Sequence, residues 1–295
     1  MRLVTLLRDG TEKVGWIDTN GPQIKLIDQG PEGPISSLLD IIHGGRATLD
    51  YISDNALNLE VVAQANVELL PPLPAVQGVF CVGLNYSEHE KEAPVSGSDF
   101  PTVFLRLARN QVSHLAPLVI PRVSPTLDWE GELVVVIGET GRHIQPEDAF
   151  DHIFGYSIYN EASVRGYQHH TSQFGMGKNF EGTGAFGPWI QTACSFGDPY
   201  EKTLETRIDG ELVQRASVSA MIHKIEDVIA YLSAATTLYA GDIICTGTPS
   251  GVGAAQTPQR FLKPGDTVSV SVSDLGSLVN PVVEEGNYTT FEKRA

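Results

Sequence analysis

The chain has 295 residues, of which 41% are apolar and 19% are charged, a composition that can bury a core and does not indicate disorder. Its formal net charge of -16 excludes a bulk attraction for nucleic acid or anionic membranes, so neither is expected as a partner. The three cysteines are far apart in the sequence and form no CxxC pair, which argues against a disulfide framework and a thiolate zinc site. The N-terminus lacks the apolar stretch of a signal peptide, and no apolar run approaches the ~18 residues of a membrane span, so we expect a cytoplasmic protein.

The first third of the chain is expected to form a small separate unit that is rich in strands. Asp9-Gly10 and Asn20-Gly21 are hairpin signals, because these residues tolerate a positive φ. They separate three short apolar runs, which are expected to be strands: Leu3–Leu7, Val14–Ile17 and Gln23–Ile27.

Helical spacing of apolar residues follows these runs. It covers Ile35–Ile42 and is expected to stop at Gly44-Gly45, and a second helix is expected over Thr48–Leu59. The stiff segment Pro71-Pro72-Leu73-Pro74 then marks a break in the chain. We therefore expect a small β-rich domain over residues 1–70.

The remainder, residues 71–295, is expected to be a larger, strand-rich domain. Its expected strands are Val79–Val82, Leu133–Ile137, Ile243–Cys245 and Val268–Val272. Ile225, Val228, Ile229 and Leu232 have the i, i+3, i+4, i+7 spacing of one amphipathic helix. Helices are too few for repeated βαβ units, so the pattern predicts an α+β fold dominated by strands.

Glu130 and Glu132 stand at i and i+2 where an apolar run begins, so both side chains are expected on one face of a strand. Neighbouring carboxylates repel, so either one takes up a proton or a cation lies between them. Ligation by carboxylates alone suits Mg²⁺, Mn²⁺ or Ca²⁺. Glu161, after the apolar run Ile153–Ile158, could complete a site of three carboxylates. Taken alone, each of these acids is more often a solvated strand end.

Three further segments carry side chains suited to acid–base or anion chemistry. His89 and Glu92 share a face if they lie on a helical turn, and the carboxylate would raise the basicity of the imidazole. Lys178, flanked by glycine and an aromatic residue, could stabilise an oxyanion. The glycine-rich segment Thr246–Gly253 could bind a carboxylate through backbone N–H groups and the Thr248 hydroxyl. The plainer alternatives are an exposed histidine, a surface lysine and a turn that needs positive φ.

His169-His170 is a weak candidate for a zinc pair, because no HExxH sequence or second cluster supports it. A covalent nucleophile is not indicated either, because the chain has no GxSxG elbow.

The order of these segments is more specific than any one of them. Together they resemble the fumarylacetoacetate hydrolase family over roughly residues 75–282, with residues 1–70 resembling the small N-terminal domain of its longer members. The segments that carry the resemblance are, in chain order, Val82-Gly83-Leu84-Asn85-Tyr86 with His89 and Glu92, Asp128-Trp129-Glu130-Gly131-Glu132-Leu133, Asn160-Glu161-Ala162-Ser163, Lys178, Gly187-Pro188-Trp189, and Gly241–Pro249 with Gly251-Val252-Gly253.

The resemblance implies a mixed β-roll or sandwich, a homodimer, and Mg²⁺ or Mn²⁺ ligated by Glu130, Glu132 and Glu161. It also implies a water-activating dyad of His89 and Glu92 on a lid, with Lys178 stabilising the negative charge of bond cleavage. The residues that would contact a 2-oxo carboxylate are Gln168, Arg106, Gly247 and Thr248.

Three positions depart from the family pattern. Glu161 stands where aspartate is usual, Arg106 where lysine is common, and Gly166 where aspartate often follows the Ser-x-Arg stretch. The first bears on how the metal binds, and the other two bear on contacts with the substrate.

The resemblance implies a metal-dependent hydrolase that cleaves a C–C bond in an acylpyruvate-type 2-oxo acid, in aromatic or organic-acid catabolism. Two alternatives remain: an isomerase, tautomerase or decarboxylase that uses the same enolate chemistry, and a non-catalytic protein that binds a 2-oxo acid or a metal. The presence of both His89 and Glu92 favours hydrolysis.

Overall fold

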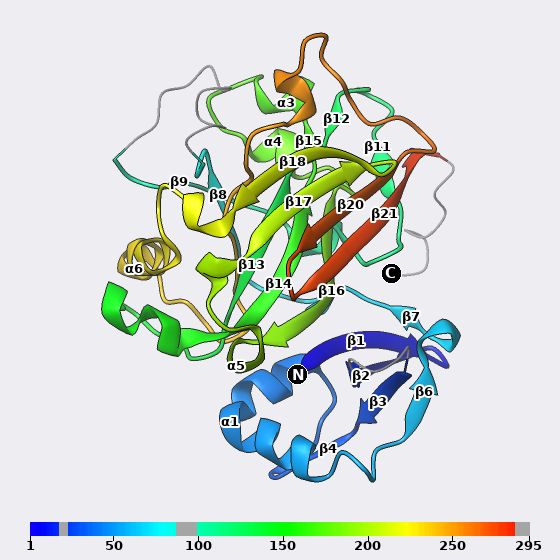
Figure 1. Ribbon diagram of the computed structural model, residues 1–295, viewed down its shortest axis with the longest axis vertical. Coiled ribbons are helices and arrows are strands. Elements are labelled where there is room, and N and C mark those ends of the chain that lie inside the picture. Colours follow the sequence, from blue (N-terminus) through cyan, green and yellow to red (C-terminus); the bar gives the residue numbers. More distant parts are fainter. Residues whose placement is uncertain (18–22, 87–98, 287–295) are drawn as a thin grey trace.

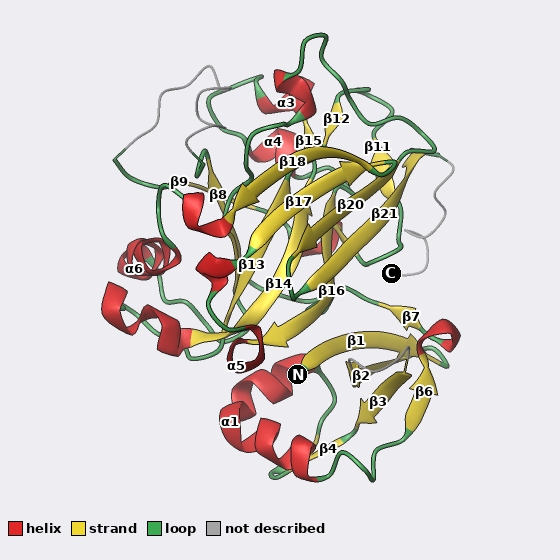
Figure 2. Ribbon diagram, viewed as in Figure 1, coloured by secondary structure: helices red, strands yellow, loops and turns green. Residues whose placement is uncertain are grey.

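Strands form most of the framework of the protein, and helices lie around their ends and edges (Figure 2). The computed structural model describes residues 1–17, 23–86 and 99–286. The expected α+β, strand-rich fold is confirmed. The largest sheet has twelve strands and runs through both the N-terminal part and the rest of the molecule (Figure 1).

In this sheet ten strands follow one another, and two short ones pair to the side. The order is β6 (Val61–Ala63), β3 (Gln23–Ile27), β2 (Thr11–Ile17), β1 (Arg2–Arg8), β16 (Gly184–Thr192), β14 (Ile153–Glu161), β13 (Gly131–Ile137), β19 (Ile243–Cys245), β8 (Val79–Gly83) and β9 (Thr102–Leu105), with β10 (Gln111–Val112) on β16 and β7 (Glu68–Leu69) on β1. Most pairs are antiparallel, but β19 and β8 run parallel. The sheet is therefore mixed, as the family resemblance implies.

A second sheet of five strands packs against β13, β14 and β16. Its order is β11 (Leu118–Ile120), β21 (Gly276–Glu284), β20 (Thr267–Val272), β17 (Thr203–Ile208) and β18 (Glu211–Ser217). Two strand pairs complete the β-structure: β12 (Leu127–Asp128) with β15 (Ser163–Val164), and β4 (Gln29–Gly30) with β5 (Gly33–Pro34).

The continuous apolar run in β13 is explained by burial on both faces. Leu133, Val135 and Ile137 belong to the core between the two sheets. Val134 and Val136 point the other way, into a second core that also contains residues of the first helix. Because side chains alternate along a strand, an apolar run without polar breaks is expected only where both faces are covered.

Within the described residues, the α-helices are α1 (Leu38–Asp54), α3 (Arg165–Gln168), α4 (Gly175–Lys178), α5 (Ala193–Phe196) and α6 (Ile225–Ala235). The 3₁₀ turns are η1 (Gln64–Asn66), η2 (Ala108–Asn110), η3 (Pro146–His152), η4 (Pro199–Glu201), η5 (Val218–Ala220) and η6 (Gly253–Ala255). Among the described helices, none is long and apolar enough to cross a membrane.

Helix α1 differs from the sequence expectation at two places, the bend at Gly45 and the C-terminal end of the helix. The chain bends at Gly45, whose φ of 54° is not helical, but helix resumes directly instead of after a break. It ends at Asp54, and Asn55 takes the C-cap position, so residues 56–59 of the expected second helix are not helical. Apolar spacing alone did not reveal this end, because Leu57 and Leu59 continue the pattern outside the helix.

The N-terminal strands join the central sheet through a pairing between β1 and β16, with Arg2 opposite Gln191 and Leu3 opposite Ile190. The sheet therefore continues across the proline segment where a domain boundary is expected. The division into residues 1–70 and 71–295 stays a prediction about folding units.

Candidate active site

Three glutamates meet where β13 begins and β14 ends. Glu130 directly precedes β13, Glu132 is its second residue, and Glu161 is the last residue of β14. The strands are antiparallel neighbours, and the Glu161 N–H donates to the Glu130 carbonyl oxygen at 2.8 Å. One carboxylate oxygen from each glutamate lies within 4.8 Å of the others, and all three residues are at most 3% exposed. Strand pairing therefore brings together acids that are about thirty positions apart in the sequence.

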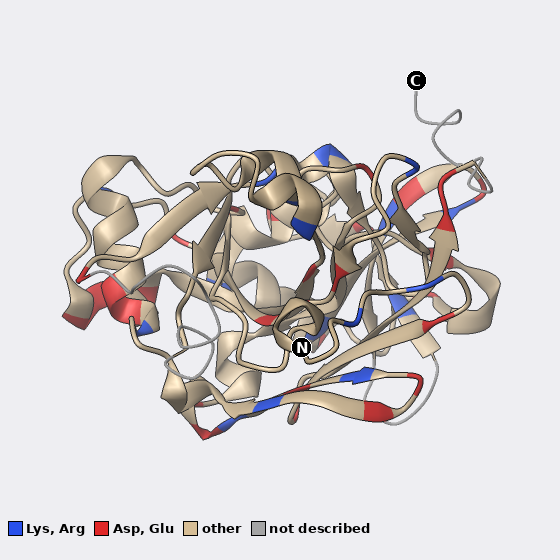
Figure 3. Cartoon of the chain, turned by 90° about the horizontal axis from the view of Figure 1, so that it is seen from above, with Lys and Arg blue, Asp and Glu red and all other residues tan. Residues whose placement is uncertain are grey.

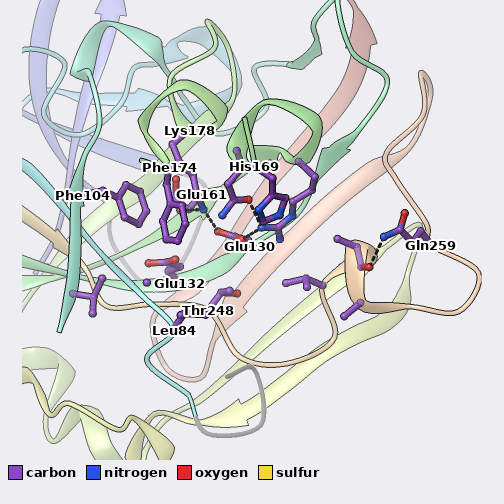
Figure 4. A pocket seen from close by; sticks show the side chains of 17 residues that line it. Leu84, Phe104, Glu130, Glu132, Glu161, His169, Phe174, Lys178, Thr248 and Gln259 are labelled. Atoms are coloured by element: carbon purple, nitrogen blue, oxygen red, sulfur yellow. Dashed lines mark hydrogen bonds and ion pairs between the residues drawn. The ribbon is translucent and has the colours of Figure 1, made fainter. Parts of the chain in front are cut away.

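Lys178, the last residue of α4, lies between two of these acids. Its Nζ is 2.6 Å from Glu130 Oε2 and 2.5 Å from Glu161 Oε2 (Figure 4). The same nitrogen lies 5.0 Å from the centre of the Phe104 ring. Lys178 is 3% exposed, so it is not a surface lysine.

Two arginines bind the remaining oxygens of the same two glutamates. Arg106 Nη1 is 2.6 Å from Glu161 Oε1, and Arg165 Nη1 is 2.6 Å from Glu130 Oε1. Arg165 also donates from Nε to Asp128 Oδ2 at 2.8 Å. No sequence pattern indicated a role for Arg165, although it lies in the Ser163-Val164-Arg165 stretch next to Glu161.

Glu132 is different, because none of the ion pairs among the described residues includes it. Its Oε2 accepts a hydrogen bond from the Gly247 N–H at 2.8 Å. Burial raises the pKa of Glu132 well above its ordinary value, and repulsion from Glu161 and Glu130 raises it further. Burial also raises the pKa of Glu161 to about 7, although Lys178 and Arg106 oppose that shift. In this environment the protein favours a proton or an additional cation at the cluster.

The three glutamates open into a cavity of about 340 Å³. Figure 4 shows Glu130, Glu132, Glu161 and Lys178 together on one wall, with Phe104 and Phe174 beside them. The lining residues are Val82, Gly83, Leu84, Phe104, Glu130, Glu132, Glu161, Arg165, Gln168, His169, Phe174, Lys178, Thr248, Val252, Ala254, Ala255 and Gln259. A charged cluster at one end and an apolar wall beside it suit a small, polar-headed ligand.

Two of the expected substrate-contacting residues line this cavity. Gln168 is 7% exposed, and its Oε1 accepts a hydrogen bond from Arg165 Nη1 at 2.8 Å, which leaves the amide N–H₂ available as a donor. Thr248 also lines the cavity, but its hydroxyl donates to the Gly131 carbonyl oxygen at 2.9 Å. This hydrogen bond therefore holds the glycine-rich loop against β13.

Arg106 and Gly247 do not line this cavity, so their expected contact with a substrate stays a prediction. The Arg106 side chain has no exposed surface and binds Glu161 from behind. The Gly247 N–H is used by Glu132, and its φ of 102° favours glycine. A Cβ at that position would come within 2.7 Å of Asn85 Cβ, so the loop packs too closely for another residue.

Two hypotheses about histidines remain, the water-activating dyad of His89 and Glu92 and the zinc pair at His169-His170. His89 and Glu92 lie outside the described residues, so the dyad stays a prediction. His169 lies on the cavity lining, whereas His170 does not. In the described part of the chain, the group suited to a metal ion consists of the three glutamates, and this geometry gives no support to a zinc pair at His169-His170.

The family model for the C-terminal domain of fumarylacetoacetate (FAA) hydrolase matches residues 78–283. This chain belongs to the fumarylacetoacetate hydrolase family. The match covers both strands that carry the glutamates, and also α3, α4 and the glycine-rich loop. The resemblance inferred from the order of the segments is thus confirmed.

Several curated relatives are oxaloacetate tautomerases. The chain is 37% identical over 251 residues to the human mitochondrial protein FAHD2A, covering 84% of this chain and 80% of the relative. It is 40% identical over 223 residues to YisK of Bacillus subtilis, covering 74% of each chain. The expected cytoplasmic location and homodimer stay predictions.

Solved structures of the family superpose over almost the whole chain. The fumarylacetoacetate hydrolase of Exiguobacterium antarcticum has a TM-score of 0.83 and 34% identity, covering 97% of this chain and all of that one. The maleylpyruvate hydrolase of Sphingobium sp. SYK-6, in complex with manganese(II) and pyruvate, has a TM-score of 0.81 and 26% identity, covering 96% and 99%. Enzymes of this fold therefore include both tautomerases and hydrolases, and one of them binds Mn²⁺.

Proposed function

We propose that this protein is a divalent-metal-dependent tautomerase that interconverts the keto and enol forms of a 2-oxo diacid of the oxaloacetate type. The observation that carries the proposal is the buried cluster of Glu130, Glu132 and Glu161 with Lys178 on one cavity wall. The similarity to two oxaloacetate tautomerases supports tautomerisation over the hydrolysis that the sequence favoured.

The cluster fits a hard divalent cation. All three candidate ligands are carboxylates, which suit Mg²⁺ and Mn²⁺ better than softer metals. Glu132 takes part in no ion pair among the described residues. Burial and repulsion from two other carboxylates raise its pKa, and the charge of Lys178 opposes this shift only in part, so the donor set is short of positive charge at this point. When bound, the cation would supply this charge and polarise the 2-oxo group of a substrate.

The side chains around the cluster are suited to binding an anion and stabilising an enolate. Gln168 presents an amide donor to the cavity, and Arg165 holds the other end of that amide. The Lys178 ammonium can donate a hydrogen bond to the oxygen on which negative charge develops. Its burial beside Phe104 and Phe174 excludes water and strengthens this interaction.

Tautomerisation requires less of the protein than hydrolysis does. One proton moves between the carbon next to the carbonyl and the carbonyl oxygen, so no C–C bond breaks and no water is added. A water-activating dyad at His89 and Glu92 is therefore not required for the proposed reaction.

A second candidate function is hydrolytic C–C cleavage of an acylpyruvate. It is supported by the likeness to a maleylpyruvate hydrolase and by the sequence positions of His89 and Glu92. Both functions would use the same glutamates and Lys178, so they differ in whether water is activated.

Parallel assays with one preparation distinguish the two functions. The first follows the enol absorbance of oxaloacetate, and the second follows cleavage of acylpyruvates into two acids. We expect fast tautomerisation and slow or absent cleavage, with His89→Ala sparing the tautomerase activity. Efficient cleavage that His89→Ala abolishes, without acceleration of tautomerisation, would favour the hydrolase instead.

A further inference from the structure

Among the described cations that bind glutamates of the cluster, Arg106 differs from Lys178 and Arg165 in not lining the cavity. We infer that Arg106 is a positioning residue of the candidate metal centre: it fixes Glu161 by one oxygen and so determines where the other oxygen points. This inference rests on the proposed metal-dependent function. It goes beyond that function because it gives a role in metal affinity to a side chain that does not line the cavity.

The guanidinium of Arg106 binds partners at both of its terminal nitrogens. Nη1 donates to Glu161 Oε1 at 2.6 Å and to the Ala162 carbonyl oxygen at 3.3 Å, and Nη2 donates to Thr183 Oγ1 at 2.9 Å. The Arg106 N–H donates to the Val79 carbonyl oxygen at 3.1 Å, so β8 fixes the backbone as well. The position of the fork relative to Glu161 is thus determined at both ends of the side chain.

The space around the Arg106 guanidinium is limited by Gly184 of β16 and by Tyr159. A Cβ on Gly184 would come within 3.0 Å of Arg106 Nη2 and within 2.3 Å of the Tyr159 hydroxyl oxygen, so a larger residue in β16 would displace the guanidinium. The Arg106 guanidinium carbon lies 5.7 Å from the centre of the Tyr159 ring. A lysine has no planar fork, so it could not reach Glu161 and Thr183 with two separate nitrogens.

Because Arg106 holds Oε1, the two oxygens of Glu161 have different partners. Oε1 faces Arg106 and Oε2 faces Lys178, in the direction of Glu130. A side chain shorter by one C–C bond, about 1.5 Å, could not keep both contacts without a shift of the strand. Glu161 and Arg106 are direct partners, and the length of the acid matches the reach of the forked base.

Direct measurement of Mn²⁺ binding to the metal-stripped full-length protein tests this role. Binding is followed by electron paramagnetic resonance and calorimetry for the wild type and for Arg106→Lys, with Arg142→Lys as the matched control. Arg142 donates to backbone carbonyls of Ser233 and Ala234 beyond the far end of β13. We expect Arg106→Lys to weaken Mn²⁺ binding roughly 10- to 100-fold, the range for partners that orient a metal ligand, and to change the Mn²⁺ spectrum. The control should bind as the wild type does.

Thr183→Val provides a second variant, which keeps Arg106 and removes the acceptor of its Nη2, together with the hydrogen bond that the Thr183 hydroxyl donates to the Phe180 carbonyl oxygen at 2.7 Å. We expect a smaller loss of Mn²⁺ affinity, and this result remains informative if Arg106→Lys fails to fold. Wild-type affinity and an unchanged spectrum in folded Arg106→Lys would overturn the inference. If Arg106→Lys fails to fold, wild-type affinity in Thr183→Val would overturn it instead. Absence of Mn²⁺ binding in the wild type would instead contradict the proposed metal centre itself.

Discussion

Glu132 has the least compensated charge of the three glutamates. Lysine and arginine nitrogens bind both oxygens of Glu130 and of Glu161, whereas in the described part of the chain the Glu132 carboxylate binds the Gly247 N–H and takes part in no ion pair. A buried carboxylate without a cation is costly to ionise. Glu132 should therefore lower the stability of the folded protein until a metal ion binds.

Replacing Glu132 with glutamine should separate stability from metal binding. The variant removes a charge that burial and two neighbouring acids disfavour, and its amide oxygen can still accept the Gly247 N–H. We expect the metal-stripped variant to melt at or above the wild-type temperature, whereas added Mn²⁺ should raise Tm only in the wild type. A variant that is clearly less stable without metal, or that Mn²⁺ still stabilises, would contradict this assignment.

Glu161 predicts a dependence of stability on pH. Burial is the main cause that raises its pKa from 4.5 to about 7, so folding favours its neutral form. The resulting stabilisation is fully present below the ordinary pKa and is lost as pH rises through about 7. In metal-stripped protein, the free energy of unfolding of the wild type should therefore fall over this interval relative to Glu161→Gln. Denaturation by urea across the interval measures the difference, and a constant difference would refute the assignment.

The residues of the site were predictable where the signal was local. Glu130 and Glu132 stand together before an apolar run, and Lys178 lies in a glycine-flanked segment. The Arg106–Glu161 pair joins positions 55 apart, and no spacing rule connects them. The family resemblance implied Arg106 as a substrate contact, and the sequence did not indicate its contact with Glu161, because that contact depends on the packing of β8 and β16.

At the scale of elements, β13 and β14 form the rigid base of the site. The apolar run predicted β13, and Ile153–Ile158 predicted most of β14. Their antiparallel pairing, with Gly131 opposite Asn160, could not be read from either run, because strand partners are chosen by the packing of the whole sheet. This pairing is what places Glu161 beside Glu130.

Asp128 connects the glycine-rich loop to the glutamates. Its Oδ1 accepts from the Gly253 N–H at 2.8 Å, and its Oδ2 accepts from Ala254 N–H at 3.0 Å and from Arg165 Nε at 2.8 Å. Arg165 in turn binds Glu130. The carboxylate thus joins η6, α3 and the start of β13 into one unit.

Asp128→Asn should weaken both the fold and the metal centre. An amide is neutral and has one acceptor oxygen, so Arg165 loses one of its two carboxylate partners and keeps Glu130. Breaking a buried pair of this kind costs about 3 kcal/mol. We expect the free energy of unfolding to fall by that order and Mn²⁺ affinity to fall with it, as measured by urea denaturation and calorimetry.

Asp242→Asn is the matched control for this change. Asp242 is also buried and accepts backbone N–H groups of Gly78 and Tyr239, but it is not part of the arginine network. The Asp242→Asn variant should be less stable than the wild type and should keep the wild-type Mn²⁺ affinity. Equal losses of affinity in both variants would indicate a general loosening of the fold and not a specific role for Asp128.

At the scale of the whole molecule, an acidic protein concentrates cations at one buried site. The formal net charge is -16, and Figure 3 shows acidic residues on many elements of the molecule. Arg106, Arg165 and Lys178 nevertheless converge on the glutamates. The protein therefore depends on local charge, and not on its overall field, to admit an anionic substrate.

The N-terminal strands also illustrate what the sequence could not reveal. The runs at Leu3–Leu7 and Val14–Ile17 predicted strands, and the proline segment predicted a break. The pairing of β1 with β16 joins residues that are nearly two hundred positions apart, so no local pattern indicated it. Leu3 and Val14 share one buried core with Phe186 and Ile190 of β16.

A chain that begins at residue 71 should accordingly be less stable than the full-length protein. It would expose one edge of β16 and the apolar side chains that Leu3 and Val14 cover. We expect a lower Tm and a greater tendency to aggregate, measured by calorimetry and light scattering. An unchanged Tm and a monodisperse solution would show instead that residues 71–295 fold as an independent unit.

The most direct measurement of the central claim is the rate at which the enol form of oxaloacetate disappears, compared before and after metal removal. The proposal predicts that wild-type enzyme accelerates this reaction, that a chelator returns it to the uncatalysed rate, and that Mn²⁺ or Mg²⁺ restores it. Glu132→Gln should stay at the uncatalysed rate at the metal concentration that restores the wild type. Full activity in the stripped enzyme, or in Glu132→Gln, would contradict a metal-dependent tautomerase built on these three glutamates.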